Sequence, residues 1–224
     1  MNIKERLNNI KTSIPEGVKL VAVSKTKPVE DLQEAYDAGQ RVFGENKALE
    51  VAHKYEVLPK DIEWHFIGHL QTNKVKYIAP FIHIIESVDS LKVLKEINKQ
   101  AKKNNRVINI LLQFHIAEED TKFGLSIEEA KEIIGSEGYV SMVNINVVGV
   151  MGMATFIDDE AQVKREFKTL KQIFDQLKAE EFKDKEDFNI ISMGMSGDYK
   201  LAIEEGSTNI RVGSSIFGVR NYAI

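Results

Sequence analysis

Two segments near the C-terminal end of the chain have the composition of a phosphate-binding site. Gly194, Ser196 and Gly197 follow one apolar run, and Gly213 and Ser214 follow the next. Small residues leave backbone N–H groups accessible, serine hydroxyls donate hydrogen bonds, and a helix that begins there adds the positive end of its dipole. Either segment alone is also explained by the ordinary preference of glycine and serine for strand ends. In combination they favour an anion such as a phosphate.

Lys25 offers a different kind of chemistry, because it stands close after the apolar residues 20–23. An amine that a protein partly removes from water is a nucleophile that forms a Schiff base with an aldehyde. The alternative is a solvated strand end beside Lys27 and Pro28, since lysine is mostly exposed in proteins. An amine and a phosphate cradle at one site fit a phosphorylated aldehyde, either pyridoxal phosphate or a sugar phosphate.

Arg211 bears on the choice between these two ligands. Alternation along a strand puts Arg211 on the same face as Gly213, so its guanidinium would point toward the ring of a cofactor whose phosphate rests at Gly213 and Ser214. There it would meet the pyridine nitrogen. The alternative is a buried arginine paired with Glu45 or with another carboxylate at a strand end, and the sequence does not separate the two arrangements.

The histidines do not form a recognisable metal-binding motif. His65 and His69 have the i, i+4 spacing that brings two ligands together on a helix, but their segment has the pattern of a strand and a turn. The chain has no cysteine, and no third ligand is evident near these two residues. We therefore expect no metal site. We expect Trp64 and the histidines to pack or hydrogen-bond around the strands; the histidines are His53, His65, His69, His83 and His115.

Short apolar runs that alternate with amphipathic stretches must position these residues. Nearly continuous Val, Ile and Leu runs, each followed by a helix, are typical of a parallel sheet covered by helices. Eight parallel strands can close into a barrel, so the pattern favours a (β/α)₈ TIM barrel over an open sheet of six strands. The expected strands are residues 19–25, 41–45, 62–68, 82–88, 107–116, 144–153, 187–193 and 208–212.

Helical patterns cover residues 28–38, 90–104 and 160–181. Pro28 suits the first turn of a helix, and Ser90 and Ser126 suit N-caps. In such a barrel the functional face is formed by the C-terminal ends of the strands. The residues considered above therefore gather at one mouth of the barrel.

Composition indicates a single domain over residues 1–224. The chain has 30 Lys and Arg against 34 Asp and Glu, a net charge of −4, and 43% hydrophobic residues. There is no apolar run of about 18 residues and no apolar N-terminal leader, so we expect neither a membrane span nor a secretion signal. The absence of cysteine is compatible with a cytoplasmic protein. The mixed charges offer no basic stripe for nucleic acid. No apolar seam demands a dimer, so we expect a monomer.

At these residues the chain closely resembles the pyridoxal-phosphate homeostasis protein family, the single-domain relatives of the alanine racemase N-terminal barrel domain. The resemblance covers nearly the whole length, in five segments that occur in order at matching intervals. These segments are residues 22–28 (AVSKTKP), 43–46 (FGEN), 64–74 (WHFIGHLQTNK), 192–196 (SMGMS) and 211–218 (RVGSSIFG).

The resemblance implies a (β/α)₈ barrel of the alanine racemase type that holds pyridoxal 5'-phosphate on Lys25 as an internal aldimine. It places Arg211 against the pyridine nitrogen and Asn46 beside the cofactor. It assigns the phosphate to Ser196, Gly213 and Ser214. Family members are implied to be carriers and buffers of the vitamin B6 pool, with PLP-dependent apoenzymes as partners and without clear catalytic activity. The chain departs from relatives that carry an asparagine in the fifth strand, and we assign no role to the loop 117–124 that follows it.

The residues themselves support binding over turnover. Racemisation needs an acid and a base on opposite faces of the substrate carbon, and all of residues 1–224 are used by one barrel, so we expect no second domain to cover the cofactor. An arginine at the ring nitrogen does not readily give up a proton, which leaves the pyridine a poor electron sink. The resemblance implies an arginine there in the racemases of this fold too, so this feature argues against a transaminase more than against a racemase. The alternatives are a weak amino-acid racemase, completed by a partner subunit or by the loop 117–124, and a Schiff-base aldolase acting on sugar phosphates.

Overall fold

Eight parallel strands form a closed barrel in which each strand pairs with its neighbours in sequence and β8 pairs with β1. The computed structural model describes residues 1–119 and 123–218. This closed order confirms the (β/α)₈ barrel and excludes the open six-stranded sheet. The strands are β1 (Lys19–Val23), β2 (Val42–Glu45), β3 (Glu63–Phe66), β4 (Ile84–Val88), β5 (Ile108–Phe114), β6 (Ile145–Gly152), β7 (Ile190–Ser192) and β8 (Asn209–Val212).

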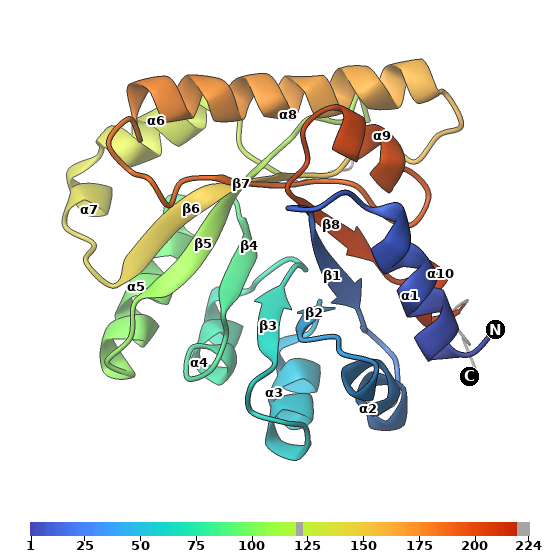
Figure 1. Ribbon diagram of the computed structural model, residues 1–224. Helices are drawn as coiled ribbons and strands as arrows, with labels where there is room; N and C mark the ends of the chain where they lie inside the picture. Colours follow the sequence, from blue (N-terminus) through green and yellow to red (C-terminus); the bar gives the residue numbers. More distant parts are fainter. Residues whose placement is uncertain (120–122, 219–224) are drawn as a thin grey trace.

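The helices lie around the outside of the barrel (Figure 1). They are α1 (Ile3–Ser13), α2 (Val29–Asp37), α3 (Ala48–Val57), α4 (Val75–Ile78), α5 (Leu91–Lys103), α6 (Ile127–Gly135), α7 (Glu137–Val140), α8 (Glu160–Glu180), α9 (Tyr199–Glu204) and α10 (Ser214–Phe217), with a 3₁₀ turn η1 (Thr72–Lys74) before α4. None of the helices in the described part of the chain is long and apolar enough to cross a membrane.

Side-chain caps determine where several helices begin. Ser90 and Ser126 accept hydrogen bonds from backbone N–H groups of the first turns of α5 and α6, as predicted. Pro28 lies one residue earlier than predicted: it precedes the first helical residue of α2, with an extended ψ of 159°. Since proline has no N–H, the position before the helix suits it as well as the first turn does.

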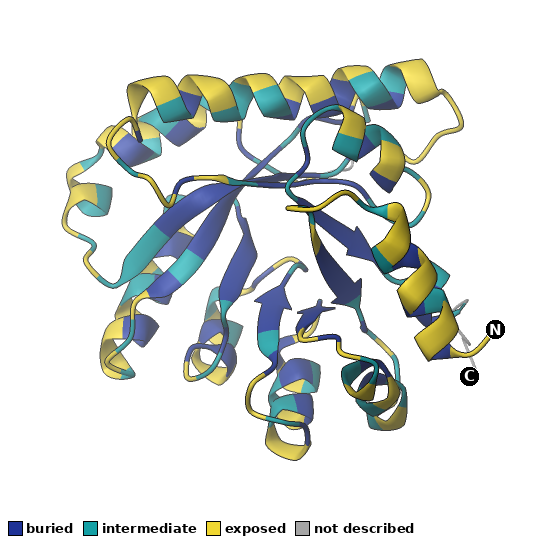
Figure 2. Ribbon diagram, viewed as in Figure 1, coloured by how far each residue is buried: buried dark blue, intermediate teal, exposed yellow. Residues whose placement is uncertain are grey.

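Most of the apolar core lies between the barrel and its helices. Trp64 and Phe66 of β3 point outward into this layer, and the ring of Trp64 lies 5.9 Å from that of Phe43 on β2. Figure 2 shows the result, with buried strands and helices that expose only their outer faces. Inside the barrel, the apolar cluster is small and consists of Ile84, Leu111, Val148 and Met151. The rest of the interior therefore has room for polar side chains.

Candidate functional site

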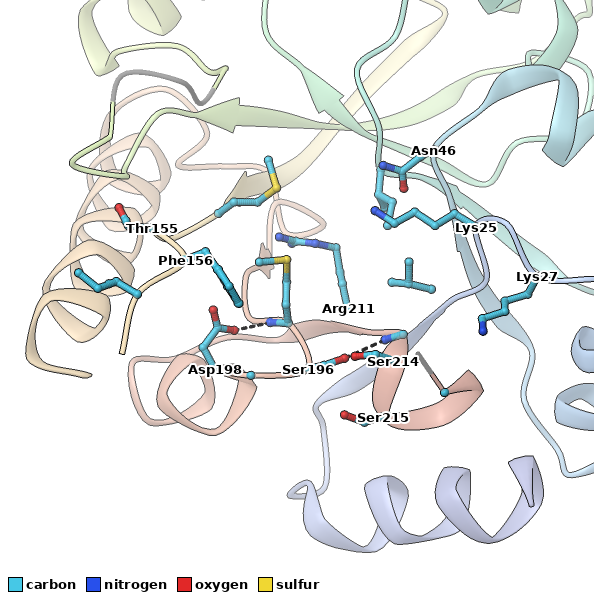
Figure 3. Close-up of a pocket in the computed structure, with 18 of the residues that line it drawn as sticks. Lys25, Lys27, Asn46, Thr155, Phe156, Ser196, Asp198, Arg211, Ser214 and Ser215 are labelled. Carbon is cyan, nitrogen blue, oxygen red and sulfur yellow. Dashed lines mark hydrogen bonds between the residues drawn. The ribbon is translucent and has the colours of Figure 1, made fainter. Parts of the chain in front are cut away.

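A cavity of about 560 Å³ opens at the mouth formed by the C-terminal ends of the strands. Figure 3 shows Lys25 and Asn46 on one side of it, and Ser196 and Ser214 on another, with Arg211 between the two groups in this view. Every site residue predicted from the sequence lines this cavity: Lys25, Asn46, Ser196, Arg211, Gly213 and Ser214. The structure thus brings together segments that lie more than 180 residues apart in the sequence.

Lys25 stands on a tight turn that links β1 to α2. Thr26 has a positive φ of 64°, and its N–H donates to Glu50 Oε1 over 2.7 Å. The Lys27 N–H donates to the Ser24 carbonyl over 3.1 Å and closes the turn. A positive φ is costly for a β-branched residue, so the carboxylate of Glu50 compensates for strain where the lysine must be presented.

A buried lysine anchors this turn from behind. Lys54 on α3 donates to the Ser24 carbonyl over 2.9 Å, and to Glu45 Oε1 and Glu50 Oε1 over 2.7 Å each. Ser24 Oγ donates to the same Glu45 oxygen over 2.6 Å. Burial raises the pKa of Glu45, and the Lys54 charge together with the hydrogen bonds from Lys54 and Ser24 opposes this rise. The network ties the end of β1, the end of β2 and α3 into one rigid support for Lys25.

Arg211 is buried at the floor of the cavity and donates hydrogen bonds to neighbouring strands. One guanidinium nitrogen donates to Ser192 Oγ over 2.7 Å and another donates to the Gly152 carbonyl over 2.9 Å. Ser192 Oγ in turn donates to Glu86 Oε2 over 2.6 Å, and that oxygen lies 3.9 Å from the guanidinium. The carboxylate compensates the buried positive charge and fixes the orientation of the guanidinium.

The partner of Arg211 is therefore Glu86, and the alternative pairing with Glu45 is wrong. Gly44 faces the barrel interior, where an added Cβ would lie 3.0 Å from a methyl group of Val21. Since side chains alternate along a strand, the next residue, Glu45, points outward to α3 and pairs with Lys54. Glu86 on β4 points inward and reaches Arg211 across the barrel.

His65 completes this interior network on the side away from the cavity. Its Nδ1 lies 2.6 Å from Glu86 Oε1, and both side chains are fully buried. Burial alone would raise the pKa of Glu86, but hydrogen bonds from His65 and Ser192 and the charge of Arg211 outweigh burial and hold this pKa below its ordinary value. Glu86 is therefore ionised at neutral pH, as a partner of a buried arginine must be.

The serine and glycine segments form a cradle of donors opposite Lys25. Ser196 Oγ accepts a hydrogen bond from the Gly213 N–H over 3.1 Å, which joins the loops after β7 and β8. A Cβ at Gly213 would lie 3.0 Å from the Val23 carbonyl, so glycine favours the close approach of this loop to β1. A Cβ at Gly197 would meet nothing within 4 Å. Space and donors are thus available for an anion beside the hydroxyls of Ser196 and Ser214.

Asn46 presents an unusual polar atom to the cavity. Its Oδ1 is buried and has no hydrogen-bond partner among the residues that the structure describes. A buried acceptor without a partner is costly, and such atoms in cavities are commonly satisfied by a ligand or water. Because amide oxygen and nitrogen can exchange places by rotation, Asn46 can either accept from or donate to a ligand.

Sequence reasoning missed the part of the cavity wall that follows β6. Thr155, Phe156 and Asp158 line the cavity, and Phe156 is 90% exposed. Both the N–H and the hydroxyl of Thr155 donate to Glu166 of α8, over 2.6 and 2.8 Å. The run of apolar residues that continues past the end of β6 was the only signal for this loop in the sequence. The loop 117–124 contributes no lining residue over 117–119 and 123–124, and residues 120–122 lie outside the described part of the chain.

Comparisons with known proteins agree with this geometry. The family model of the alanine racemase N-terminal domain matches residues 1–221. The pyridoxal phosphate homeostasis protein of Aquifex aeolicus is 38% identical over 237 residues, which cover 99% of this chain and 100% of the relative. The corresponding protein of Pasteurella multocida is 36% identical, with full coverage of both chains.

The chain belongs to the pyridoxal phosphate homeostasis protein family. This confirms the resemblance seen in the sequence. Among solved structures, PipY of Synechococcus elongatus PCC7942 is similar with a TM-score of 0.88 and 32% identity, covering 97% of this chain and 100% of PipY. A second PipY structure, with PLP bound, has a TM-score of 0.86 and 31% identity at the same coverage. An alanine racemase of Clostridium difficile has a TM-score of 0.77 at 16% identity, covers 99% of this chain and 60% of its own, and shows the shared fold alone.

The support behind Lys25 can be tested through stability. Lys54→Met should lower the free energy of unfolding by about 3–5 kcal/mol, because it leaves Glu45 buried without its cation. The measurement is urea unfolding followed by circular dichroism. Lys171→Met is the matched control: Lys171 pairs with Asp175 on the exposed face of α8, and its loss should cost less than about 1 kcal/mol. Equal and small losses in both variants would contradict a supporting role for Lys54.

Proposed function

We propose that this protein binds pyridoxal 5'-phosphate reversibly at Lys25 and takes part in vitamin B6 homeostasis as a carrier, without turning over a substrate. The observation that carries the proposal is the convergence of an amine, a buried guanidinium and a donor cradle in one cavity. PLP has an aldehyde, a pyridine ring and a phosphate, and each has a counterpart there. The names of the relatives and the PLP-bound PipY structure support the same ligand.

The donor set fits the chemical groups of PLP. When bound, PLP supplies an aldehyde that condenses reversibly with a lysine amine. Lys25 would provide the amine, Arg211 would face the pyridine nitrogen, and Asn46 would lie beside the ring. Ser196, Gly213 and Ser214 would hold the phosphate through hydroxyl and backbone donors. The unpartnered Oδ1 of Asn46 and the open space beside Gly197 are the features that a ligand of this kind would fill.

Arg211 favours storage of the cofactor over catalysis with it. Arginine stays protonated and only donates hydrogen bonds, so beside the pyridine nitrogen it leaves that nitrogen without a proton. Burial lowers the pKa of Arg211, while the charges of Glu86 and Asp198 oppose this effect. A neutral pyridine ring is a poor sink for the electrons that transamination must place on the cofactor, so this argument weighs more against a transaminase than against a racemase.

The open mouth suits exchange with other proteins. Ser214 and Phe156 are exposed at the rim, so a bound cofactor would remain accessible from the solvent side. We propose that PLP-dependent apoenzymes accept cofactor from this site, and that the protein acts in the cytoplasm as a monomer. Weak amino-acid racemisation is the competing function, because the fold is shared with alanine racemases.

The attachment site can be identified directly. Incubation with PLP followed by borohydride should fix one cofactor on the peptide that contains Lys25, and Lys25→Ala should remove this label. Lys27→Ala is the matched control, because Lys27 lines the same cavity and its Nζ donates to the Phe217 carbonyl; it should keep the label. Peptide mass mapping is the readout. A label on another lysine would overturn the assignment of Lys25, and no label at all would favour the sugar-phosphate aldolase.

The phosphate cradle can be tested by retention of the cofactor. The double variant Ser196→Ala/Ser214→Ala should raise the dissociation constant for PLP at least about tenfold, because hydrogen bonds to a charged group contribute about 1.5–3 kcal/mol each. The label on Lys25 should still form at high PLP. Ser141→Ala, an exposed serine just after α7, is the control. An unchanged dissociation constant would place the phosphate elsewhere.

Solvent deuterium separates the carrier from a racemase. The PLP-saturated protein in D₂O should not exchange the α-hydrogen of L-alanine above the rate of free PLP at the same concentration, because racemisation needs an acid and a base on opposite faces of the substrate carbon and we assign no second such group beside Lys25. Mass spectrometry of the recovered alanine is the measurement. Enzyme-catalysed uptake, or formation of D-alanine, would establish the racemase in place of the carrier.

A further inference from the structure

Three potential metal ligands converge at the opposite mouth of the barrel, where the strands begin. Glu63 and His65 lie on the same face of β3, and His83 immediately precedes β4. One ligand atom from each lies within 4.8 Å of the other two, and His83 Nε2 is 3.6 Å from Glu63 Oε2. The backbone N–H of His83 donates to the Trp64 carbonyl over 2.9 Å, which fixes His83 beside β3. Strand β3 and the hydrogen bond of His83 to it therefore hold the cluster together.

His65, a member of this cluster, has an unsatisfied ring nitrogen. The residue is fully buried, and its Nε2 has no hydrogen-bond partner among the described residues. Its Nδ1 lies 2.6 Å from Glu86 Oε1, and an ionised carboxylate can only accept, so Nδ1 carries the proton. In the neutral ring Nε2 then presents a lone pair. A buried lone pair without a donor is costly, and a metal ion would remove that cost.

The surroundings of His65 are those of a metal ligand. In proteins a ligating histidine usually donates its other ring nitrogen to a carboxylate, which orients the ring and increases its basicity. Glu86 has this relation to His65. The rings of His65 and His83 lie 5.9 Å apart with an interplanar angle of 16°, so both histidines border the same small space.

His83 and Glu63 complete a set of ligands that is accessible from solvent. Their side chains are 42% and 38% exposed, which leaves an entry path and a position for water.

Lys19 is the group that competes with a cation at this mouth. Its Nζ lies 3.5 Å from Glu63 Oε2, and both side chains are about two-fifths exposed. An exposed ion pair of this kind contributes less than about 1 kcal/mol. A divalent ion can therefore displace Lys19 from Glu63 at small cost.

We propose that Glu63, His65 and His83 form a binding site for a divalent transition metal ion, best matched by Zn²⁺. Two imidazole nitrogens and one carboxylate oxygen, with a fourth position open to water, are a ligand set that Zn²⁺ prefers, whereas Mg²⁺ and Ca²⁺ prefer oxygen ligands alone. Ligand atoms around a tetrahedral zinc ion lie about 3.4 Å apart. The ligand atoms of His83 and Glu63 are 3.6 Å apart, close to this spacing. To bind zinc, these two partly exposed side chains would move closer to His65.

The expectation of no metal considered His65 and His69 as the ligand pair, with no cysteine in the chain and no third ligand evident near them. His69 lies beyond the C-terminal end of β3, where it faces Asp89 at 3.7 Å. The further ligands come from the first residue of β3 and from the residue before the next strand. Glu63 lies two residues before His65 on the same face of β3, whereas His83 is 18 residues further along the chain and is brought beside them by the pairing of β3 with β4.

Calorimetric titration of the full, PLP-free and metal-stripped chain with Zn²⁺ tests the proposal independently of the proposed PLP site. One equivalent should bind with a micromolar or lower dissociation constant, and His83→Ala and Glu63→Gln should each raise this constant at least about tenfold. Lys19→Gln should lower it, because the competing cation is gone. Both weakening substitutions lie at exposed positions, so the fold should persist, and circular dichroism checks this.

His53→Ala is the matched control, since His53 is exposed on α3 and does not belong to the cluster. It should bind Zn²⁺ as the unaltered chain does. Zn²⁺ should also raise the melting temperature of the unaltered chain and of His53→Ala, but not that of His83→Ala. The absence of stoichiometric binding, or equal affinity in His83→Ala and the unaltered chain, would overturn the proposal.

Discussion

The burial of the Arg211 guanidinium inside a closed barrel is the constraint on which the rest of the site depends. A buried charge without a partner costs several kcal/mol, so the barrel interior must contain an opposite charge and the hydrogen bonds that orient it. Glu86 supplies the charge, Ser192 bridges the two, and His65 holds the other carboxylate oxygen. Four strands thereby contribute one polar network along the barrel interior.

This polar interior explains where the apolar core lies. The larger apolar side chains, such as Trp64 and Phe66, point outward and pack beneath the helices, while the interior retains only a small apolar cluster. The two mouths of the barrel carry different side chains. The C-terminal mouth combines a rigidly supported Lys25 with an open rim, and the N-terminal mouth presents His65 from the same network. A rigid amine beside an accessible rim is the combination that reversible capture of a ligand requires.

The strand-end residues could be predicted from the sequence because they are local signals. Lys25, Asn46 and Gly213 each follow an apolar run closely, and a parallel barrel places all such ends at one mouth. Glu86 could not be assigned in the same way, since it lies in the middle of the apolar run 82–88, where it is one of three polar residues. Its role depends on which face of β4 points inward and on which residues of β7 and β8 lie across the barrel.

The wall formed by Thr155 and Phe156 was unpredictable for a related reason. These residues lie beyond the end of β6. Thr155 is held by Glu166 of α8, which is eleven residues further along the chain. Contacts between a loop and a distant helix face leave no periodic pattern in the sequence. The support of the Lys25 turn by Lys54 is likewise a tertiary contact, visible only once α3 packs behind β1 and β2.

The central claim is that one cavity binds all three functional groups of PLP. A crystal structure of the protein soaked with PLP tests it most directly. The account predicts density continuous with Lys25 Nζ, a pyridine nitrogen against the Arg211 guanidinium, and a phosphate between Ser196, Gly213 and Ser214. Density for PLP at a different lysine, or a ring turned so that its nitrogen faces away from Arg211, would contradict it.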